Sequence, residues 1–255
     1  MTDLSLPRRL APIALAAALL AGCGASGGSD AATTTTKPSK ATTTTAADAT
    51  TTTAAGSGDA PSVDDLTALL PPASKLGEGW TDAPADSSSD TTGSKALEEQ
   101  CPDLTKLGDT QGDDDDVKGN YVGPGSAELD VSFNRTAKAF TDDEFQTIVD
   151  AVNACKVTYT SDGSTVSLAF QAEVDPGIGD QGVKMLASAT LQTDGMDTPI
   201  DFKTYLYAFR RGAVGVSMQG TDGVDGQTLT VTPFDTEMLA NLGPILDQGV
   251  KDLQG

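Results

Sequence analysis

Residues 199–210 read PIDFKTYLYAFR, and this stretch decides the fold class. Successive side chains of a β-strand point to opposite faces, so the stretch has two faces to cover. Both are rich in apolar groups: Tyr205, Tyr207 and Phe209 share one face, and Phe202, Leu206 and Ala208 share the other. A strand that is apolar on both faces is covered on both faces. The stretch therefore predicts a central strand between two helical layers or beneath loops; the alternative is that its tyrosine face lines a groove for a ligand.

Other predicted strands lie on both sides of this stretch in the sequence. Residues 183–192 form a long strand, which joins the central one through Asp194-Gly195, a hairpin signal. Further strands are predicted at 117–122, 127–133, 166–174, 214–218 and 228–232. Short turns connect most of these segments, which favours antiparallel pairing.

Helices are predicted where capping residues precede an apolar stripe. Ser62 caps a first helix, and Thr141 opens a capping box before a helix whose apolar face ends in Cys155. Asp235 or Thr236 caps a final helix. The order of the elements predicts an α+β fold: a single antiparallel sheet of about five to seven strands, with helices packed mainly on one face and one disulfide.

The chain divides into three regions. All twelve aromatic residues lie at or beyond Trp80, so we expect the packed core in one globular domain at residues 61–255. Residues 23–60 contain runs of threonine but no Leu, Ile, Val or aromatic residue, which predicts a disordered linker. This linker is either a bare spacer or O-glycosylated on threonine.

Residues 1–22 have the pattern of a lipoprotein signal peptide. A basic pair precedes an apolar run from Leu10 to Ala21, which is too short to span a membrane as a helix. The run ends in Leu-Ala-Gly-Cys23, which resembles the bacterial lipobox. The resemblance implies cleavage before Cys23, a diacylglycerol on its sulfur, and a protein anchored to the cell membrane on the extracytoplasmic side. The alternative is an ordinary secretory signal with a chance cysteine.

Two cysteines remain after the lipidation site. Cys101 and Cys155 lie in a domain that we expect to be exported, and such a pair predicts one disulfide. The alternative is two free, buried thiols. Because Cys155 lies on the apolar face of its helix, Cys101 is expected to approach that helix from the sheet.

Composition argues against several classes of function. The formal net charge of −21 disfavours nucleic acid as a partner. The absence of histidine removes His-dependent catalysis and His-ligated metals, and no spacing singles out a catalytic carboxylate pair. Residues 177–182 match G-x-G-x-x-G, but the residues after them alternate like a strand, so dinucleotide binding is not expected. We therefore predict a protein that is not an enzyme, with no metal and no cofactor.

The candidate ligand-binding residues are identified by strand parity. Tyr205, Tyr207 and Phe209 share one face of the central strand, and Arg211 continues the same parity at its end. A cation beside phenol groups in a strongly acidic domain is a candidate for holding a ligand.

Short motifs along the domain carry a family resemblance. They are an early helix ending in Leu69-Leu70, then Cys101-Pro102, the helix from Phe145 to Cys155, the Gly179-Asp180 loop, and the turn Phe209-Arg210-Arg211-Gly212. In these the chain resembles actinobacterial envelope lipoproteins whose folded part is similar to the extracellular sensor domain of the mycobacterial Ser/Thr kinase PknH. The resemblance implies a cleft under a sheet flanked by helices, and an unidentified ligand.

These observations together predict a non-catalytic, ligand-binding or sensor-like domain held at the membrane by the lipid on Cys23. Its partner would be a small molecule or an envelope protein. Two alternatives stay open from the sequence: a carrier of lipids or other apolar molecules, and a protein-interaction module at the cell wall.

Substitution of Cys23 tests the anchor. The variant Cys23→Ala removes the thiol that accepts the lipid, so the protein is expected to move from the membrane fraction to the soluble fraction. Fractionation followed by immunoblotting measures the change. Membrane association of the variant equal to that of the wild type would refute the lipid anchor.

Overall fold

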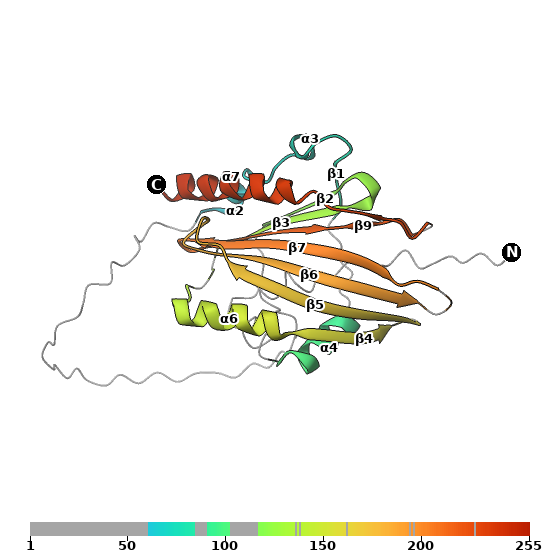
Figure 1. Cartoon of the computed structure of the whole chain (residues 1–255). Coiled ribbons are helices and arrows are strands. Elements are labelled where there is room, and N and C mark those ends of the chain that lie inside the picture. Colours follow the sequence, from blue (N-terminus) through green and yellow to red (C-terminus); the bar gives the residue numbers. More distant parts are fainter. Residues whose placement is uncertain are drawn as a thin grey trace, which may run out of the picture.

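The computed structural model describes residues 61–84, 91–102 and 117–255, apart from Thr136, Lys138, Asp162, Asp194, Met196 and Gln227 (Figure 1). The signal peptide, Cys23 and the linker lie outside the described residues. No helix in the described part of the chain is long and apolar enough to span a membrane.

The fold is α+β, as predicted, and is built on one large antiparallel sheet. Among the described residues this sheet has eight strands in the order β1-β2-β3-β8-β7-β6-β5-β4. The strands are β1 (Thr81–Asp82), β2 (Val117–Val122), β3 (Glu128–Asn134), β4 (Lys156–Ser161), β5 (Ser164–Val174), β6 (Gln181–Thr193), β7 (Ile200–Arg211) and β8 (Val214–Thr221). The sheet is larger than predicted because β1 and β4 were not expected. A small separate hairpin pairs β9 (Gly223–Val224) with β10 (Val231–Thr232).

The helices cover both faces of the sheet (Figure 1). They are α2 (Val63–Thr67), α3 (Ala73–Leu76), α4 (Thr91–Gln100), α6 (Asp142–Ala154) and α7 (Thr236–Gln254), with a 3₁₀ turn at Pro124–Ser126. The prediction that helices pack mainly on one face is therefore wrong. The alternative drawn from residues 199–210, a central strand covered on both sides, describes the observed layers.

Two apolar clusters on opposite faces meet at β7. The α6 cluster contains Ala96, Leu97, Cys101, Phe145, Ile148, Val149, Val152, Cys155, Val157, Leu168, Phe170, Val183, Met185, Ala187, Ala189, Leu206 and Ala208. The α7 cluster contains Leu66, Ala73, Val117, Tyr121, Ala127, Leu129, Val131, Phe133, Ile178, Phe209, Val214, Val216, Met218, Phe234, Leu239, Leu242, Leu246 and Val250. Even-numbered β7 residues belong to the α6 cluster and odd-numbered ones to the α7 cluster, because successive side chains of a strand point to opposite faces.

The predicted Ser62 cap and Thr141 capping box both form, and the Ser62 cap is also a capping box. Ser62 accepts a hydrogen bond from the backbone N–H of Asp65, whose carboxylate accepts one in return from Ser62 N–H. Thr141 and Glu144 form the same reciprocal pair at α6. Asp235 caps α7. These local contacts satisfy N–H groups that a helix leaves without partners.

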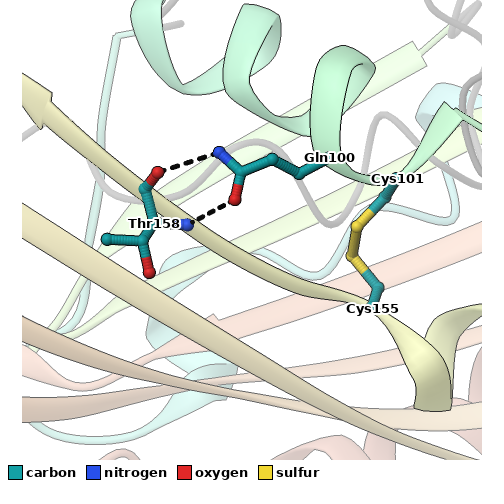
Figure 2. The surroundings of a disulfide bond; sticks show 4 residues. All are labelled: Gln100, Cys101, Cys155 and Thr158. Carbon is teal, nitrogen blue, oxygen red and sulfur yellow. Dashed lines mark hydrogen bonds between the residues drawn. A yellow bond between two sulfur atoms is a disulfide. The ribbon is translucent and has the colours of Figure 1, made fainter.

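The Cys101–Cys155 disulfide is present, with the two Cα atoms 5.8 Å apart (Figure 2). It ties the end of α4 to the residue directly after α6. Both cysteines are buried in the α6 cluster. The prediction of one disulfide is confirmed, and the alternative of two free thiols is wrong.

Two side-chain amides form hydrogen bonds with backbone N–H and C=O groups along the β4–β5 edge. Gln100 donates to the carbonyl of Thr158 at 2.8 Å and accepts from its N–H at 2.9 Å (Figure 2). Asn153 makes the same pair of bonds with Ala172 of β5, at 3.0 and 2.7 Å. Each amide thus takes the place of a neighbouring strand at one residue, which reduces the pairing capacity of the edge.

Each helical layer covers only part of its face. On the α7 side, α7 packs on β7 and β8, whereas the same face of β5 carries the exposed residues Ser167, Ala169, Gln171 and Glu173. This places the odd-numbered face of β7 at a border between covered and open sheet.

Truncation of the two β7 faces tests the double-sided core. Leu206→Ala is expected to lower the free energy of unfolding by about 2–5 kcal/mol, and Phe209→Ala by about 3–5 kcal/mol, because each opens a cavity in a different cluster. The matched control Lys203→Ala, at an exposed position of β7, is expected to stay within about 0.5 kcal/mol of the wild type. Denaturant unfolding measures all three. A neutral result for either core variant would contradict a strand buried on both faces.

Candidate functional site

Tyr205 and Tyr207 lie half-buried on the odd-numbered face of β7. The register places Leu186 of β6 beside Tyr205 and Lys184 beside Tyr207. We call these four residues the tyrosine surface. Its residues lie where the α7 cluster gives way to open sheet, so the rings are packed on one side and accessible on the other.

Lys184 is held above the ring of Tyr207. Its Nζ atom lies 5.3 Å from the ring centroid and 2.8 Å from a carboxylate oxygen of Asp175. The hydrogen bond with Asp175 raises the pKa of Lys184 and lowers the pKa of Asp175. The side of the tyrosine surface at Tyr207 thus carries a cation neutralised by a carboxylate and stacked on a phenol ring.

Tyr205 ends a row of aromatic rings that crosses the sheet. Its ring lies 6.4 Å from that of Phe234, which lies 6.1 Å from Trp80 in an edge-to-face arrangement. A side chain at Gly220 would meet the Phe234 ring at 2.3 Å, so glycine is needed there to seat that ring on β8. Contact with Phe234 on one side restricts rotation of the Tyr205 ring. The ring therefore loses little side-chain entropy when a ligand binds.

The two tyrosine hydroxyls keep their hydrogen-bonding capacity. Neither hydroxyl bonds to another group within the part of the chain that the structure describes. Burial, and then the nearby Asp222 carboxylate, raise the pKa of Tyr205. The hydroxyl of Tyr205 therefore remains protonated at neutral pH and is able both to donate and to accept a hydrogen bond.

The other two predicted ligand-binding residues lie elsewhere. Phe209 is 4% exposed and belongs to the interior of the α7 cluster. Arg211 makes two hydrogen bonds to Asp247 of α7, at 2.7 and 2.6 Å, and an ion pair with Asp180 at 2.9 Å. The structure therefore brings Tyr205 and Tyr207 to the surface, buries Phe209, and uses Arg211 as a link between elements.

The Arg211 link joins three parts of the domain. Asp180 belongs to the loop between β5 and β6, and it also accepts a hydrogen bond from Gly212 N–H in the β7–β8 turn. Gly179 in this loop has a φ of +66°, and a side chain there would approach the Arg210 carbonyl to 2.6 Å. A strand, not a helix, comes after the glycine-rich loop, so its glycines serve chain packing rather than a phosphate.

A row of buried polar side chains was not foreseen. Thr204, Ser217, Gln219 and Thr221 lie on the even-numbered face of β7 and its partners on β8, and all are at most 8% exposed. The hydroxyl groups of Thr204 and Thr221 lie 3.3 Å apart. The polar residues of β8 alternate with apolar ones, and the structure buries both faces of this strand.

The described residues contain no group of three or more Cys, Asp or Glu side chains placed to hold a metal ion. The candidate site therefore consists of aromatic rings, hydroxyl groups and a neutralised cation. Such a set of groups is suited to binding by stacking and hydrogen bonding.

No protein-family profile matches this chain, and no curated protein matches it. Among solved structures, the chain is similar to an uncharacterised protein from Mycobacterium smegmatis, the Rv0999 ortholog, with a TM-score of 0.39 and 12% sequence identity. That match covers 77% of this chain and 99% of the other. A likeness at this level carries no argument about fold or function. The resemblance to the PknH sensor domain stays a prediction.

The Arg211–Asp247 pair predicts a specific loss of stability in acid. Hydrogen bonds from Arg211 lower the pKa of Asp247 below its unfolded value of about 3.9. The stabilisation is therefore present at neutral pH and is lost as the pH falls from about 4 through the folded pKa. Asp247→Asn is expected to lower the free energy of unfolding by about 1–2 kcal/mol at pH 7 and to flatten its decline below pH 4.

The matched control for this change is Asp252→Asn. Asp252 lies on the same helix and accepts a hydrogen bond from Gln248, a neighbour one turn away. Denaturant unfolding from pH 7 to pH 2.5 compares the two variants with the wild type. Equal curves for Asp247→Asn and the wild type would show that the pair does not stabilise the fold.

Proposed function

We propose that this protein is a lipid-anchored, extracytoplasmic lipoprotein whose domain at residues 61–255 binds a ligand at the tyrosine surface without catalysing a reaction. The observation that carries the proposal is the pair of hydroxyls on Tyr205 and Tyr207, which keep their hydrogen-bonding capacity within the described residues while their rings are held by packing. A tyrosine whose ring packs against apolar neighbours and whose hydroxyl stays accessible is typical of recognition surfaces.

The order of the surrounding groups supports binding. Phe234 and Trp80 brace Tyr205, and Lys184 with Asp175 braces Tyr207. Groups held in place before a ligand arrives lose less side-chain entropy on binding. The open sheet beside them, formed by β6 and β5, supplies room for the ligand next to the rings.

Charge restricts the class of ligand. The whole chain carries a formal net charge of −21, and the only cation of the tyrosine surface is already paired with Asp175. A polyanion would therefore be repelled. We propose an uncharged or cationic ligand with hydroxyl or amine groups that the tyrosine hydroxyls bind. The membrane anchor would keep the domain near such ligands in the envelope, and the signal would pass to another envelope protein.

Removal of the two hydroxyls tests the proposal. The double variant Tyr205→Phe/Tyr207→Phe keeps the rings but deletes both hydrogen-bonding groups. The full-length protein, extracted from membranes, is compared with the variant by mass spectrometry of the small molecules and lipids that each retains. Loss of two hydrogen bonds of about 1 kcal/mol each is expected to lower the amount retained by about tenfold or more.

Tyr121→Phe is the matched control, because Tyr121 belongs to the same cluster but lies on β2 and is 4% exposed. It is expected to retain the ligand at the wild-type level. Equal retention by the double variant and the wild type would refute the tyrosine surface as the site. Stoichiometric recovery of a lipid would instead favour the carrier alternative.

A further inference from the structure

The Cys101–Cys155 disulfide holds α4, a ten-residue helix whose sequence favours helix formation only weakly. Helix α4 has Gly93 in its first turn and Glu98 and Glu99 in its last turn, with no basic residue there. Glycine lowers helix propensity, and acidic groups near a helix C-terminus oppose the helix dipole. By contrast, α6 and α7 both have acidic residues in the first turn, which favour the helix dipole. A helix of ten residues with these features is marginal without tertiary support.

The apolar support of α4 is small. Ala96 and Leu97 are the buried apolar residues of the helix itself, and both join the α6 cluster. The cluster also receives Phe145, Ile148 and Val149 from α6, which cover the same face of the sheet. Most of this core is therefore retained when α4 is absent. The α7 cluster lies on the opposite face and does not include α4.

The end of α4 carries two specific attachments side by side (Figure 2). Gln100 pairs with both backbone groups of Thr158, and the next residue, Cys101, forms the disulfide. The covalent bond keeps the Gln100 carboxamide at a high effective concentration near the β4 edge. Without it, the two hydrogen bonds of Gln100 and the burial of Ala96 and Leu97 are the described contacts that tie the last turns of α4 to the sheet.

We propose that the disulfide is a redox latch for α4: when it is reduced, α4 leaves the β4 edge while the rest of the domain stays folded. In the reaction, a dithiol reductant supplies two electrons and two protons. The bond between the two sulfurs breaks, Cys101 and Cys155 become thiols, and the reductant becomes a disulfide. Release of α4 frees the N–H and C=O of Thr158 on an edge strand, where another extended segment is able to pair.

Hydrogen exchange on the full-length protein tests the latch, with dithiothreitol as the dithiol. In the oxidised protein, the amides of α4 and of Thr158 are expected to be protected. After reduction, their exchange is expected to accelerate by on the order of 100-fold or more, toward the rate of an unstructured peptide. The amides of α7 are expected to remain protected by at least ~1000-fold relative to that rate. The double variant Cys101→Ala/Cys155→Ala is expected to behave like the reduced protein without any reductant.

Two outcomes overturn the proposal. In the first, α4 keeps its protection after alkylation and mass spectrometry show both thiols to be free. In the second, α4 and α7 lose protection together, which means that the disulfide holds the whole domain rather than one helix.

The role of Gln100 is tested separately in the oxidised protein. Gln100→Ala is expected to accelerate exchange at Thr158 by about tenfold, and the control Gln146→Ala is expected to leave it unchanged, because Gln146 bonds within α6, to Asp150. No acceleration in Gln100→Ala would refute the edge contact as part of the latch.

Discussion

The structure depends on the need to cover strand β7 on both faces. Leu206 points into one apolar cluster and Phe209 into the other, so neither face tolerates water. A single layer of helices covers only one face of a sheet. The domain therefore places α6 and α4 on one side and α7 and α2 on the other (Figure 1), and the two apolar clusters beneath them meet at β7.

The offset between the two layers places the candidate site. Because α7 packs on β7 and β8 but leaves β5 and β6 open on its side, Tyr205 and Tyr207 lie where packing ends. Residues at such a border are held by neighbours on one side and face solvent on the other. The Arg211 link to Asp247 and Asp180 fixes α7 at this border, so a residue first considered as a ligand contact instead helps to define where the site begins.

The features that the sequence predicted correctly depend on neighbours along the chain. Local patterns predicted the Ser62 cap, the Thr141 capping box, the two apolar faces of residues 199–210 and the hairpin to residues 183–192. The disulfide was predicted from a count of cysteines. Strand β4 was missed, although Val157 and Tyr159 alternate within it, because it comes after α6 without a turn signal.

The features that the sequence did not predict are set by distant contacts. The partners of Arg211 lie 31 and 36 residues away, and no spacing rule connects them. The polar face of β8 is buried although its alternation resembles that of a strand exposed on one side. The placement of helices on both sides depends on which strands become neighbours, and β3 pairs with β8 rather than with the next strand in sequence.

That pairing of β3 with β8 has a consequence for how the chain acquires its structure. Leu129 pairs with Gly220, and Leu69 next to α2 contacts Gly249 of α7, so the first elements of the domain are completed by the last. In a chain that emerges N-terminus first, β2 and β3 are available to pair early, before β8 is present to pair with β3. Contacts so distant in sequence make folding slow, and the early hairpin stays open to wrong partners until the final helix arrives. The domain is thus committed to its native topology only once nearly all of it is present.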